Sequence, residues 1–589
     1  MTRSLPGSSG TGPVRLVDQL VTELARAGVR HVFGVGGANI EDLFDAVHRS
    51  GTVRAVVAKH EFSAVTMADG CARSSRRLGV VAATSGGGAM NMLPGLAEAH
   101  ASRVPVLALV GQPPTDEEGR GAFQDSSGKG GSFDLRQVLA PVSRFCARVE
   151  DVGSFAELLS RAMASAQAPP RGPSVLLLPK DVQRATVRQP PGTAASLEPS
   201  TGIGSNGGAM AARFGLEAGV DATRVAGVLS RAGQILVIAG EEVAASGARE
   251  ELALLAGSLG AWVAVTPDAK DVFDNRDPCF AGVAGVMGHA NVEACLRRAD
   301  VCLLAGTRLP LVARAGLEHA LAATEVVYLG SESAFVPATT IRGDLRDILR
   351  TLDSGLMPQV RSCPPHAGPR PAPPAGQATP DAGKAVFSYA RALAVVEEVL
   401  PEDAHVFVDA GNTGSSAVHH LPAPRDGRFV VAVGMGGMGY TFGAGIGAAL
   451  TTGRRTYVLA GDGSFFMHGM EVHTAVEYSA PVTFVVFNNN AHAMCVLREQ
   501  LFQGGVRRDD SFRRTDIAGA VAAAFPTLDV TAARSPGQLR QALRHANAGN
   551  GPAFIALDCD ANEIPPFLPF QHAIETDALA GHPQRGERV

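Results

Sequence analysis

The 589-residue sequence contains few cysteines and none of the patterns that bind zinc or form a disulfide framework. Its eight cysteines include no CxxC pair, and no histidine cluster lies beside them. A reducing cytosol therefore fits this chain best. Glycine, polar residues or charges interrupt every apolar run before the roughly 18 residues that a membrane span needs. The N-terminal stretch has no apolar core, so we expect neither a membrane span nor a signal peptide.

A strong excess of charge is also missing. The 52 Lys and Arg residues nearly balance the 57 Asp and Glu residues, and the net charge of -5 comes with no long basic run. This argues against nucleic acid as a partner. Hydrophobic residues make up 46% and charged residues 19%, as in an ordinary globular protein. A chain of this length is too long for one hydrophobic core, which predicts three or four domains.

Short apolar runs recur along the chain, each followed by a Gly-rich turn and then a helical pattern. Examples are GVVAATSGGG in the first third, ILVIAGEE in the middle and TYVLAGDG in the last third. Runs of four to six β-branched residues without alternation are typical of strands buried on both faces. Strands that alternate with amphipathic helices predict an α/β fold made of doubly wound parallel sheets.

Two low-complexity stretches divide the chain. One is rich in Gly, Ala, Ser and Pro and the other in Pro, so both are interpreted as linkers that bury too little apolar surface to pack. We expect linkers at 189–219 and 356–384, separating domains at 14–188, 220–355 and 385–570. The C-terminal stretch GHPQRGERV is expected to be loose.

The segment from Thr456 to Asn490 contains the most informative pattern. A strand ends in Gly461-Asp462-Gly463, a helical stretch follows, and a second strand ends in Asn488-Asn489-Asn490. In a strand–helix–strand unit the two strand ends meet at the same edge of the sheet, which would bring Asp462 close to Asn489. Carboxylate, amide and carbonyl oxygens are ligands that Mg²⁺ favours, and the glycines let phosphate come close to the backbone.

This segment resembles the GDG…NN motif of thiamine-diphosphate-dependent enzymes. The resemblance implies that Asp462, Asn489 and the backbone carbonyl of Ala491 bind Mg²⁺, with Ser464 against the diphosphate. The alternative is a strand-end turn and an Asn-rich loop without a ligand. The resemblance implies three α/β domains that are pyrimidine-binding, central and diphosphate-binding in order. It further assigns several residues to the cofactor, namely Asn412, Thr413, Met438, Gly461, Asp462, Gly463, Ser464, Asn489, His492 and Met494.

Glu61 opens a helical stretch after a buried strand in AVVAKHEFSAVTMADG. A glutamate at such a place is often a first-turn charge that meets the helix dipole. In the family, however, a glutamate there hydrogen-bonds N1′ of the aminopyrimidine ring, so that the 4′-imine can remove the C2 proton. The KHE pattern is close to that of acetolactate synthase, and we expect Glu61 to be catalytic.

The run GMGGMGYTFGAGIG contains Gly434, Gly436 and Gly439 in a G-x-G-x-x-G spacing, so a nicotinamide-binding turn is a rival interpretation. The preceding strand is not the first of its domain, which disfavours that rival. The run resembles the family's segment before GDG, in which a bulky residue, here Met438, props the cofactor in its bent shape. Met438 also reads as an ordinary buried core residue.

Two further stretches resemble the acetolactate synthase and pyruvate oxidase subgroup. In GRGAFQD, Gln124 follows Ala-Phe and is expected to face the active site, and GPSVLLLPKDVQ resembles the end of that domain. Two turns depart from the family. Gly36 replaces a proline in the early turn, and the later loop reads Ser85-Gly86-Gly87-Gly88, which predicts looser backbone.

Substrate and flavin contacts are the least specific expectations. Arg498 aligns with a Trp that selects the acceptor in acetolactate synthase, and we expect it to pair with an anion, either a substrate group or a local Glu such as Glu499. His468 is a further substrate candidate, although such a histidine is as often a satisfied polar group. Some relatives bind FAD in the central domain, where Arg308 would meet FAD or a carboxylate.

The resemblance implies an enzyme that decarboxylates a 2-oxo acid such as pyruvate and transfers the acyl carbanion to a carbonyl acceptor. The cofactor carries the chemistry and the protein supplies orientation and protons. The alternatives are a simple 2-oxo-acid decarboxylase and a non-catalytic cofactor-binding subunit. Since Glu61 and the GDG motif lie in domains that meet across a subunit interface in the family, we expect a homodimer or homotetramer.

Overall fold

The computed structural model describes residues 13–187, 222–356, 362–365, 387–503 and 509–579. The predicted linkers therefore lie outside the described residues, apart from 356 and 362–365, and the C-terminal stretch GHPQRGERV lies outside them as well. The chain forms two compact units, one of residues 1–69 and 77–215 and one of residues 70–76 and 216–589. The domain boundaries expected from the sequence remain predictions.

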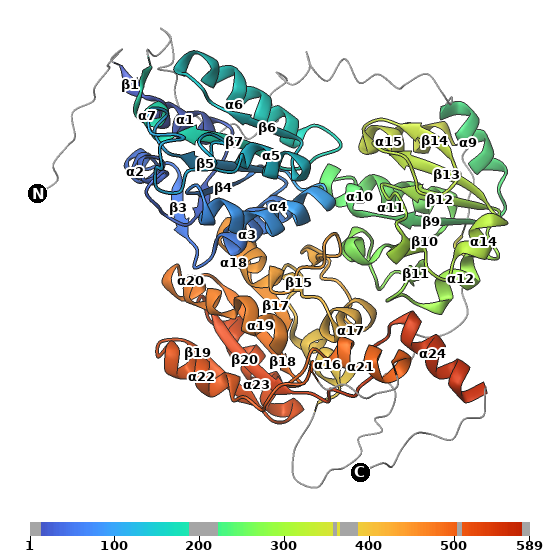
Figure 1. Cartoon of the computed structure of the whole chain (residues 1–589). Helices are drawn as coiled ribbons and strands as arrows, with labels where there is room; N and C mark the ends of the chain where they lie inside the picture. Colours follow the sequence, from blue (N-terminus) through green and yellow to red (C-terminus); the bar gives the residue numbers. More distant parts are fainter. Residues whose placement is uncertain (1–12, 188–221, 357–361, 366–386, 504–508, 580–589) are drawn as a thin grey trace, which may run out of the picture. The chain divides into compact units, whose positions relative to one another are not determined.

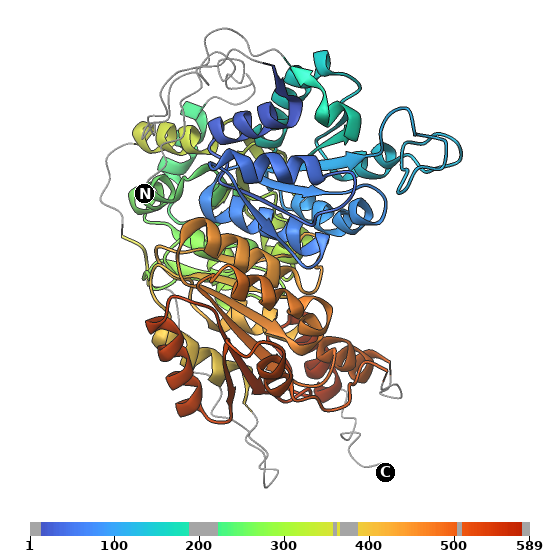
Figure 2. The ribbon, with the colours of Figure 1, turned by 90° about the vertical axis from the view of Figure 1, so that its left-hand side faces the viewer.

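The first unit contains a six-stranded parallel sheet in the order β3-β2-β4-β5-β7-β6. Helices cover both faces of this sheet (Figures 1 and 2). The strands are β2 (His31–Gly34), β3 (Arg54–Val57), β4 (Gly79–Ala83), β5 (Val106–Gln112), β6 (Phe145–Arg148) and β7 (Ser174–Pro179). The helices are α1 (Leu16–Arg26), α2 (Glu41–Ser50), α3 (Glu61–Ser75), α4 (Gly87–Ala101), α5 (Leu135–Leu139), α6 (Val152–Gln167) and α7 (Lys180–Arg184). A short antiparallel pair, β1 (Val14–Arg15) and β8 (Thr186–Val187), joins the two ends of this domain.

The second unit contains two more six-stranded parallel sheets. The central sheet has the order β11-β10-β9-β12-β13-β14. Its strands are β9 (Ile235–Ala239), β10 (Trp262–Val265), β11 (Phe280–Val283), β12 (Val301–Ala305), β13 (Glu325–Gly330) and β14 (Thr339–Arg342). Its helices are α9 (Ala222–Arg231), α10 (Glu241–Ser246), α11 (Arg249–Leu259), α12 (Ala290–Leu296), α13 (Leu311–Arg314), α14 (Glu318–Ala322) and α15 (Leu345–Gly355).

The third sheet has the order β16-β15-β17-β18-β20-β19. Its strands are β15 (His405–Val408), β16 (Phe429–Val431), β17 (Thr456–Gly461), β18 (Val482–Asn488), β19 (Asp529–Ala533) and β20 (Ala553–Asp558). Its helices are α16 (Tyr389–Val399), α17 (Asn412–His420), α18 (Tyr440–Thr452), α19 (Asp462–His468), α20 (Val472–Glu477), α21 (Ala493–Phe502), α22 (Ile517–Ala524), α23 (Pro536–Ala548) and α24 (Leu568–Leu579). Numbered within each domain, the first and third sheets share the order 2-1-3-4-6-5, whereas the central sheet has 3-2-1-4-5-6.

The predicted fold class is confirmed. The β-branched runs form strands that are buried along their length, such as β9 and β12 of the central sheet. Helices pack on both faces because strands without polar alternation need apolar cover on each side. One hydrophobic cluster in the second unit includes residues of both its sheets, from Val225 to Cys559. Among the described residues, no helix has the length and apolar character that crossing a membrane requires.

Candidate active site

The site in the second unit lies at the carboxyl edge of the third sheet. Strands β17 and β18 are adjacent and parallel, with Gly461 paired to Phe487. Asp462 and Asn489 therefore directly follow neighbouring strand ends, as the sequence pattern predicts. In sheets of this type ligands bind at the carboxyl edge, close to the point where the strand order reverses. Here that point lies between β15 and β17.

The carboxyl group of Asp462 is buried at this edge. Burial raises its pKa to about 6, against the opposing effect of backbone N–H groups of Gly463, Asn490 and Ala491 that bond to the carboxylate. Its Oδ2 atom has no hydrogen-bond partner among the described residues. A buried carboxylate oxygen without a partner is costly, and a bound cation would remove that cost.

Asn489 lies on the loop that follows β18. Its amide nitrogen donates to the hydroxyl of Tyr389 at 2.8 Å, and its Oδ1 accepts from the backbone N–H of Ala491 at 3.0 Å. These bonds turn the amide oxygen toward the backbone of Ala491. Asn490 has φ 56, a left-handed conformation that lets the loop turn sharply after the strand.

Other buried polar atoms at this edge also lack partners among the described residues. They are Ser464 Oγ, Asn412 Oδ1, Asn488 Oδ1 and His492 Nδ1. Native proteins leave few buried polar atoms unpaired, so a group of them at one sheet edge indicates a missing polar ligand. Among the described residues, no cluster of three His, Cys, Asp or Glu is placed to hold a metal. A metal at Asp462 would therefore need amide, carbonyl and ligand oxygens as well, which is the donor set that Mg²⁺ accepts.

The Gly-rich turn before α18 is held by a residue that sequence reasoning missed. Asp409 lies directly after β15. Its two carboxylate oxygens accept from the single backbone N–H of Gly439 at 3.0 and 3.1 Å, and one of them also accepts from the Thr441 hydroxyl at 2.7 Å. The methyl carbon of Met438 lies 3.1 Å from the position that a Cβ on Gly463 would take, beside the His492 ring. Asp409 thus positions Met438 over the GDG turn. An aspartate at the end of an apolar run was the available signal.

The remaining candidates of this unit differ in their surroundings. Thr413 is buried, with its hydroxyl 3.7 Å from the Cβ position of Gly461. His468 packs against Gly439, and Met494 is half-buried at the start of α21. Arg498 lies exposed on α21, and its pairing with an anion stays a prediction. The side chains of His468 and Met494 are brought to the same domain edge, whereas Arg308 lies in the central domain.

The site in the first unit surrounds Glu61, which begins α3. Its Oε2 accepts from the Asn91 amide at 3.0 Å. Its Oε1 lies 3.0 Å from the position that a Cβ on Gly88 would occupy, so a side chain at Gly88 would displace the carboxylate. Asn91 and Gly88 both belong to α4, and Asn91 was not singled out in the sequence. The two carboxyl oxygens therefore have different surroundings.

Gln124 lies beside the end of β4. It has φ 61, which is rare for a residue other than glycine, and its Oε1 accepts from the Thr84 hydroxyl at 2.9 Å. Thr84 in turn accepts from the backbone N–H of Asn39 at 3.3 Å. The structure thus joins Gln124 to the loops after β2 and β4, where the strand order of this sheet reverses. Such strained conformations are found preferentially at functional sites.

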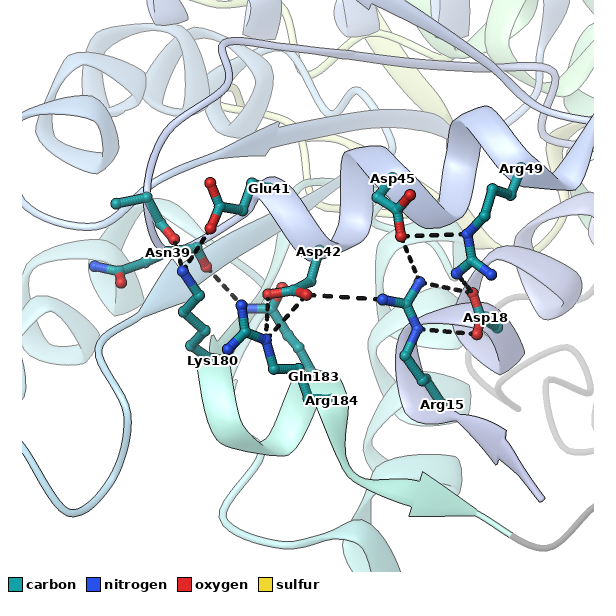
Figure 3. Close-up of polar contacts among 11 residues, drawn as sticks. Arg15, Asp18, Asn39, Glu41, Asp42, Asp45, Arg49, Lys180, Gln183 and Arg184 are labelled. Carbon is teal, nitrogen blue, oxygen red and sulfur yellow. Dashed lines mark hydrogen bonds and ion pairs between the residues drawn. The ribbon is translucent and has the colours of Figure 1, made fainter.

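The loop that contains Gly36 was expected to be loose, and the structure shows how it is held. Lys180 of α7 donates to the carbonyl of Ala38 at 2.6 Å, and Gln183 donates to the carbonyl of Asn39 at 2.8 Å (Figure 3). Figure 3 also shows Arg184 bonded to both oxygens of Asp42, each at 3.0 Å. Side chains from α7 therefore hold this loop at Ala38 and Asn39, and the looser backbone expected at Gly36 stays a prediction.

Three family models match the chain in order. They are "Thiamine pyrophosphate enzyme, N-terminal TPP binding domain" at residues 14–130, "central domain" at 222–352 and "C-terminal TPP binding domain" at 409–557. The chain belongs to the thiamine pyrophosphate enzyme family. Thiamine diphosphate is accordingly its cofactor, and the resemblance to thiamine-diphosphate-dependent enzymes seen in the sequence is confirmed.

The chain is also similar to individual proteins of known sequence and to a solved structure. The chain is 25% identical to a "Probable acetolactate synthase large subunit" of Methanocaldococcus jannaschii, covering 94% of this chain and 93% of the relative. It is 25% identical to "Acetolactate synthase isozyme 1 large subunit" of Escherichia coli, covering 95% and 98%. The crystal structure of benzoylformate decarboxylase from Polynucleobacter necessarius has a TM-score of 0.77 at 20% identity, covering 94% of this chain and all of that one. The last likeness concerns the fold alone.

Proposed function

We propose that this enzyme decarboxylates a 2-oxo acid such as pyruvate and transfers the acyl group to a carbonyl acceptor, as the names of its acetolactate synthase relatives indicate for those proteins. The observation that carries the proposal is the group of unpaired buried polar atoms around Asp462. They fit a diphosphate and its magnesium ion, and they lie in the domain that the C-terminal TPP-binding family model covers. When bound, thiamine diphosphate supplies the nucleophilic carbon and accepts the electrons released as CO₂ leaves.

In this proposal, the residues of the third domain anchor the cofactor. Asp462, the Asn489 amide oxygen and the Ala491 carbonyl hold Mg²⁺, and Ser464 and Asn412 bond to the diphosphate. Gly461 leaves room for the anion because it carries no side chain, and Gly463 leaves room for the His492 ring and Met438. Met438, held by Asp409, supports the cofactor ring and keeps its reactive parts in register.

Glu61 acts on the pyrimidine in the same proposal. The Asn91 amide donates to Oε2, so that oxygen must present a lone pair. Oε1, the oxygen above Gly88, is not bonded to Asn91, and we propose that it is the oxygen that shares a proton with N1′. Gln124, held by Thr84, faces the reacting groups from the same domain and orients the substrate. Arg498, His468 and His492 are proposed as contacts to the substrate carboxylate and the acceptor.

A homodimer or homotetramer and a cytoplasmic location complete the proposal. The family resemblance supports the first, since Glu61 and Asp462 belong to domains that act together across subunits in the family. All eight cysteines are free, which supports a reducing compartment. Light scattering of the fully active enzyme should give the mass of a dimer or a tetramer, and a monomer mass would contradict the proposal.

The deciding experiment is mass spectrometry of the products from pyruvate together with a panel of aldehydes and 2-oxo acids. We expect a coupled product that retains both carbon skeletons. Release of the free aldehyde alone would make the enzyme a simple decarboxylase. As a control, Glu61→Gln should bind the cofactor normally but exchange its C2 proton about 10²- to 10⁴-fold more slowly, the usual loss when an acid–base group is removed. Exchange at the wild-type rate would contradict the role of Glu61.

A further inference from the structure

The central sheet has the strand order of dinucleotide-binding folds, 3-2-1-4-5-6, with its reversal point between β9 and β12. In such folds the turn after the first strand carries G-x-G-x-x-G, and its second glycine lets the backbone approach the pyrophosphate. Here the turn after β9 begins with Gly240, and the place of the second glycine is taken by Glu242. A carboxylate therefore stands where a dinucleotide would place its own negative charges.

The crevice at this reversal point is filled by the protein itself. A Cβ on Gly240 would lie 2.4 Å from Thr307 Cβ and 2.6 Å from the Gly306 carbonyl, so the turns after β9 and β12 are in direct contact. A Cβ on Gly306 would meet Leu345 at 2.7 Å and Glu242 Cβ at 2.9 Å. The turns after β9 and β12 therefore pack directly against each other, which leaves little space for a phosphate between Gly240 and Gly306.

The backbone donors that a phosphate would need are also occupied. The N–H of Glu242 donates to the Gly306 carbonyl at 3.2 Å, and the N–H of Val243 donates to the Gly240 carbonyl at 3.1 Å. The Glu242 carboxylate accepts from the N–H of Ser331, after β13, at 3.0 and 3.3 Å. These two N–H groups and the Glu242 carboxylate thus have partners within the central domain.

Glu241 and Arg308, at the same edge, each form an ion pair, although Arg308 Nε has no hydrogen-bond partner among the described residues. Glu241 accepts from the buried Arg428, which precedes β16, at 2.8 and 3.0 Å. Arg308, the expected flavin contact, pairs with Glu332 at 3.3 Å and lies over the Phe335 ring at 4.1 Å. Arg308 is therefore held inside the central domain, and Glu241 links that domain to the third sheet.

We infer that Glu242 and its neighbours close the dinucleotide-binding crevice of the central domain and that the enzyme works without bound FAD. In place of a dinucleotide, this edge binds Arg428 through Glu241. Glu242 repels a pyrophosphate, and displacing it would strand the Ser331 N–H without an acceptor. The flavin expectation for Arg308 thus does not fit the structure. This inference is independent of the carboligase proposal, since flavin binding is measured without substrate.

The first test is flavin binding by the full-length enzyme loaded with thiamine diphosphate and Mg²⁺. We expect no flavin in the supernatant of heat-denatured protein and no change in FAD fluorescence anisotropy on titration with FAD. Flavin recovered in an amount equal to the protein, or saturable FAD binding, would overturn the inference.

The second test concerns the closure. Glu242→Ala should lower the melting temperature by about 2–4 °C, since it leaves the Ser331 N–H without its carboxylate acceptor. Glu242→Gln, which retains an acceptor, should restore most of that loss. Glu293→Ala, which removes an exposed partner of Arg297 in the same domain, is the control and should melt like wild type. A Glu242→Ala variant that melts with the control would show that the crevice is not held closed in this way.

Discussion

At the carboxyl edge of the central sheet, Glu241 and Glu242 are bonded to Arg428 and to the Ser331 N–H. At the same edge of the third sheet, Asp462 and Ser464 have buried oxygen atoms without partners among the described residues. Both edges consist of parallel strand ends and helix starts. The two edges have the same architecture but differ in whether their acidic side chains have partners. The fold alone therefore does not show where a ligand binds, and polar atoms that the protein leaves unpaired are the better guide.

We call the carboxyl edge of the central sheet, around Glu241 and Glu242, the closed edge, and that of the third sheet, around Asp462, the open edge. The largest effect is expected at the closed edge, from Arg428→Met. Arg428 bonds to Asp271 and Glu241, and Asp271 also pairs with Arg249 at 2.7 Å. Removing the guanidinium leaves two carboxylates buried with too little positive charge, which should cost about 3–5 kcal/mol of unfolding free energy. Denaturant unfolding measures this loss.

The control for this prediction is Arg425→Met, in the same loop. Arg425 pairs with Asp274 at 3.1 Å but is half exposed, so its loss should cost less than about 1 kcal/mol. Equal losses in the two variants would mean that the closed edge does not stabilise the second unit.

The next largest effect is expected at the open edge, from Asp462→Ala. Loss of a ligand oxygen should weaken thiamine diphosphate binding by on the order of 100-fold in the presence of Mg²⁺, which is the upper range for losing a residue that supports a metal. Isothermal calorimetry measures this. The matched change Glu242→Ala at the closed edge should leave the affinity unchanged. If Asp462→Ala binds the cofactor like wild type, the assignment of the open edge fails.

A smaller effect is expected from Asn91→Ala. The variant loses the bond to Glu61 Oε2, and the carboxyl group should then spend less time oriented toward N1′. We expect C2 proton exchange to slow by about tenfold, equivalent to about 1.4 kcal/mol, with cofactor affinity unchanged. Proton NMR in deuterated water follows the exchange. Gln167→Ala, which removes an exposed amide of α6, should exchange at the wild-type rate, and a wild-type rate in Asn91→Ala would remove Asn91 from the mechanism.

The smallest effect concerns the acid stability of the second unit. Burial, together with the nearby His419 and Lys270, lowers the pKa of His289 to about 3. Below the ordinary value near 6.5 the unfolded chain binds a proton that the folded chain refuses, so stability falls as the pH drops from 6.5 toward 3. At pH 5.5 the loss from this one group is on the order of 1 kcal/mol.

The variant His289→Asn tests this dependence. The asparagine oxygen can accept the Val283 N–H bond that His289 Nδ1 now accepts at 3.0 Å, but it does not titrate. Its melting temperature should therefore fall less between pH 7.5 and 5.5 than that of wild type. His545→Asn, at an exposed histidine, is the control. Parallel melting curves for His289→Asn and wild type would contradict the prediction.

The sequence by itself determined the fold class and the position of the proposed metal site. Unalternating apolar runs can be satisfied only as strands covered on both faces, so the parallel sheets follow from local pattern. Asp462 and Asn489 were predicted to meet because neighbouring parallel strands end at one edge, and the pairing of Gly461 with Phe487 confirms the geometry. Local chemistry and strand polarity were enough for these conclusions.

Only the tertiary structure decided which polar groups have partners. Asp409 was missed because its bonds reach Gly439, thirty residues along the chain, and Asn91 was missed because its partner Glu61 is thirty residues away. The closure at Glu242 depends on turns after three different strands, which no local pattern relates. Hydrogen bonding between distant segments depends on how the sheets bring them together, and that is why the open and closed edges could be told apart only in the folded protein.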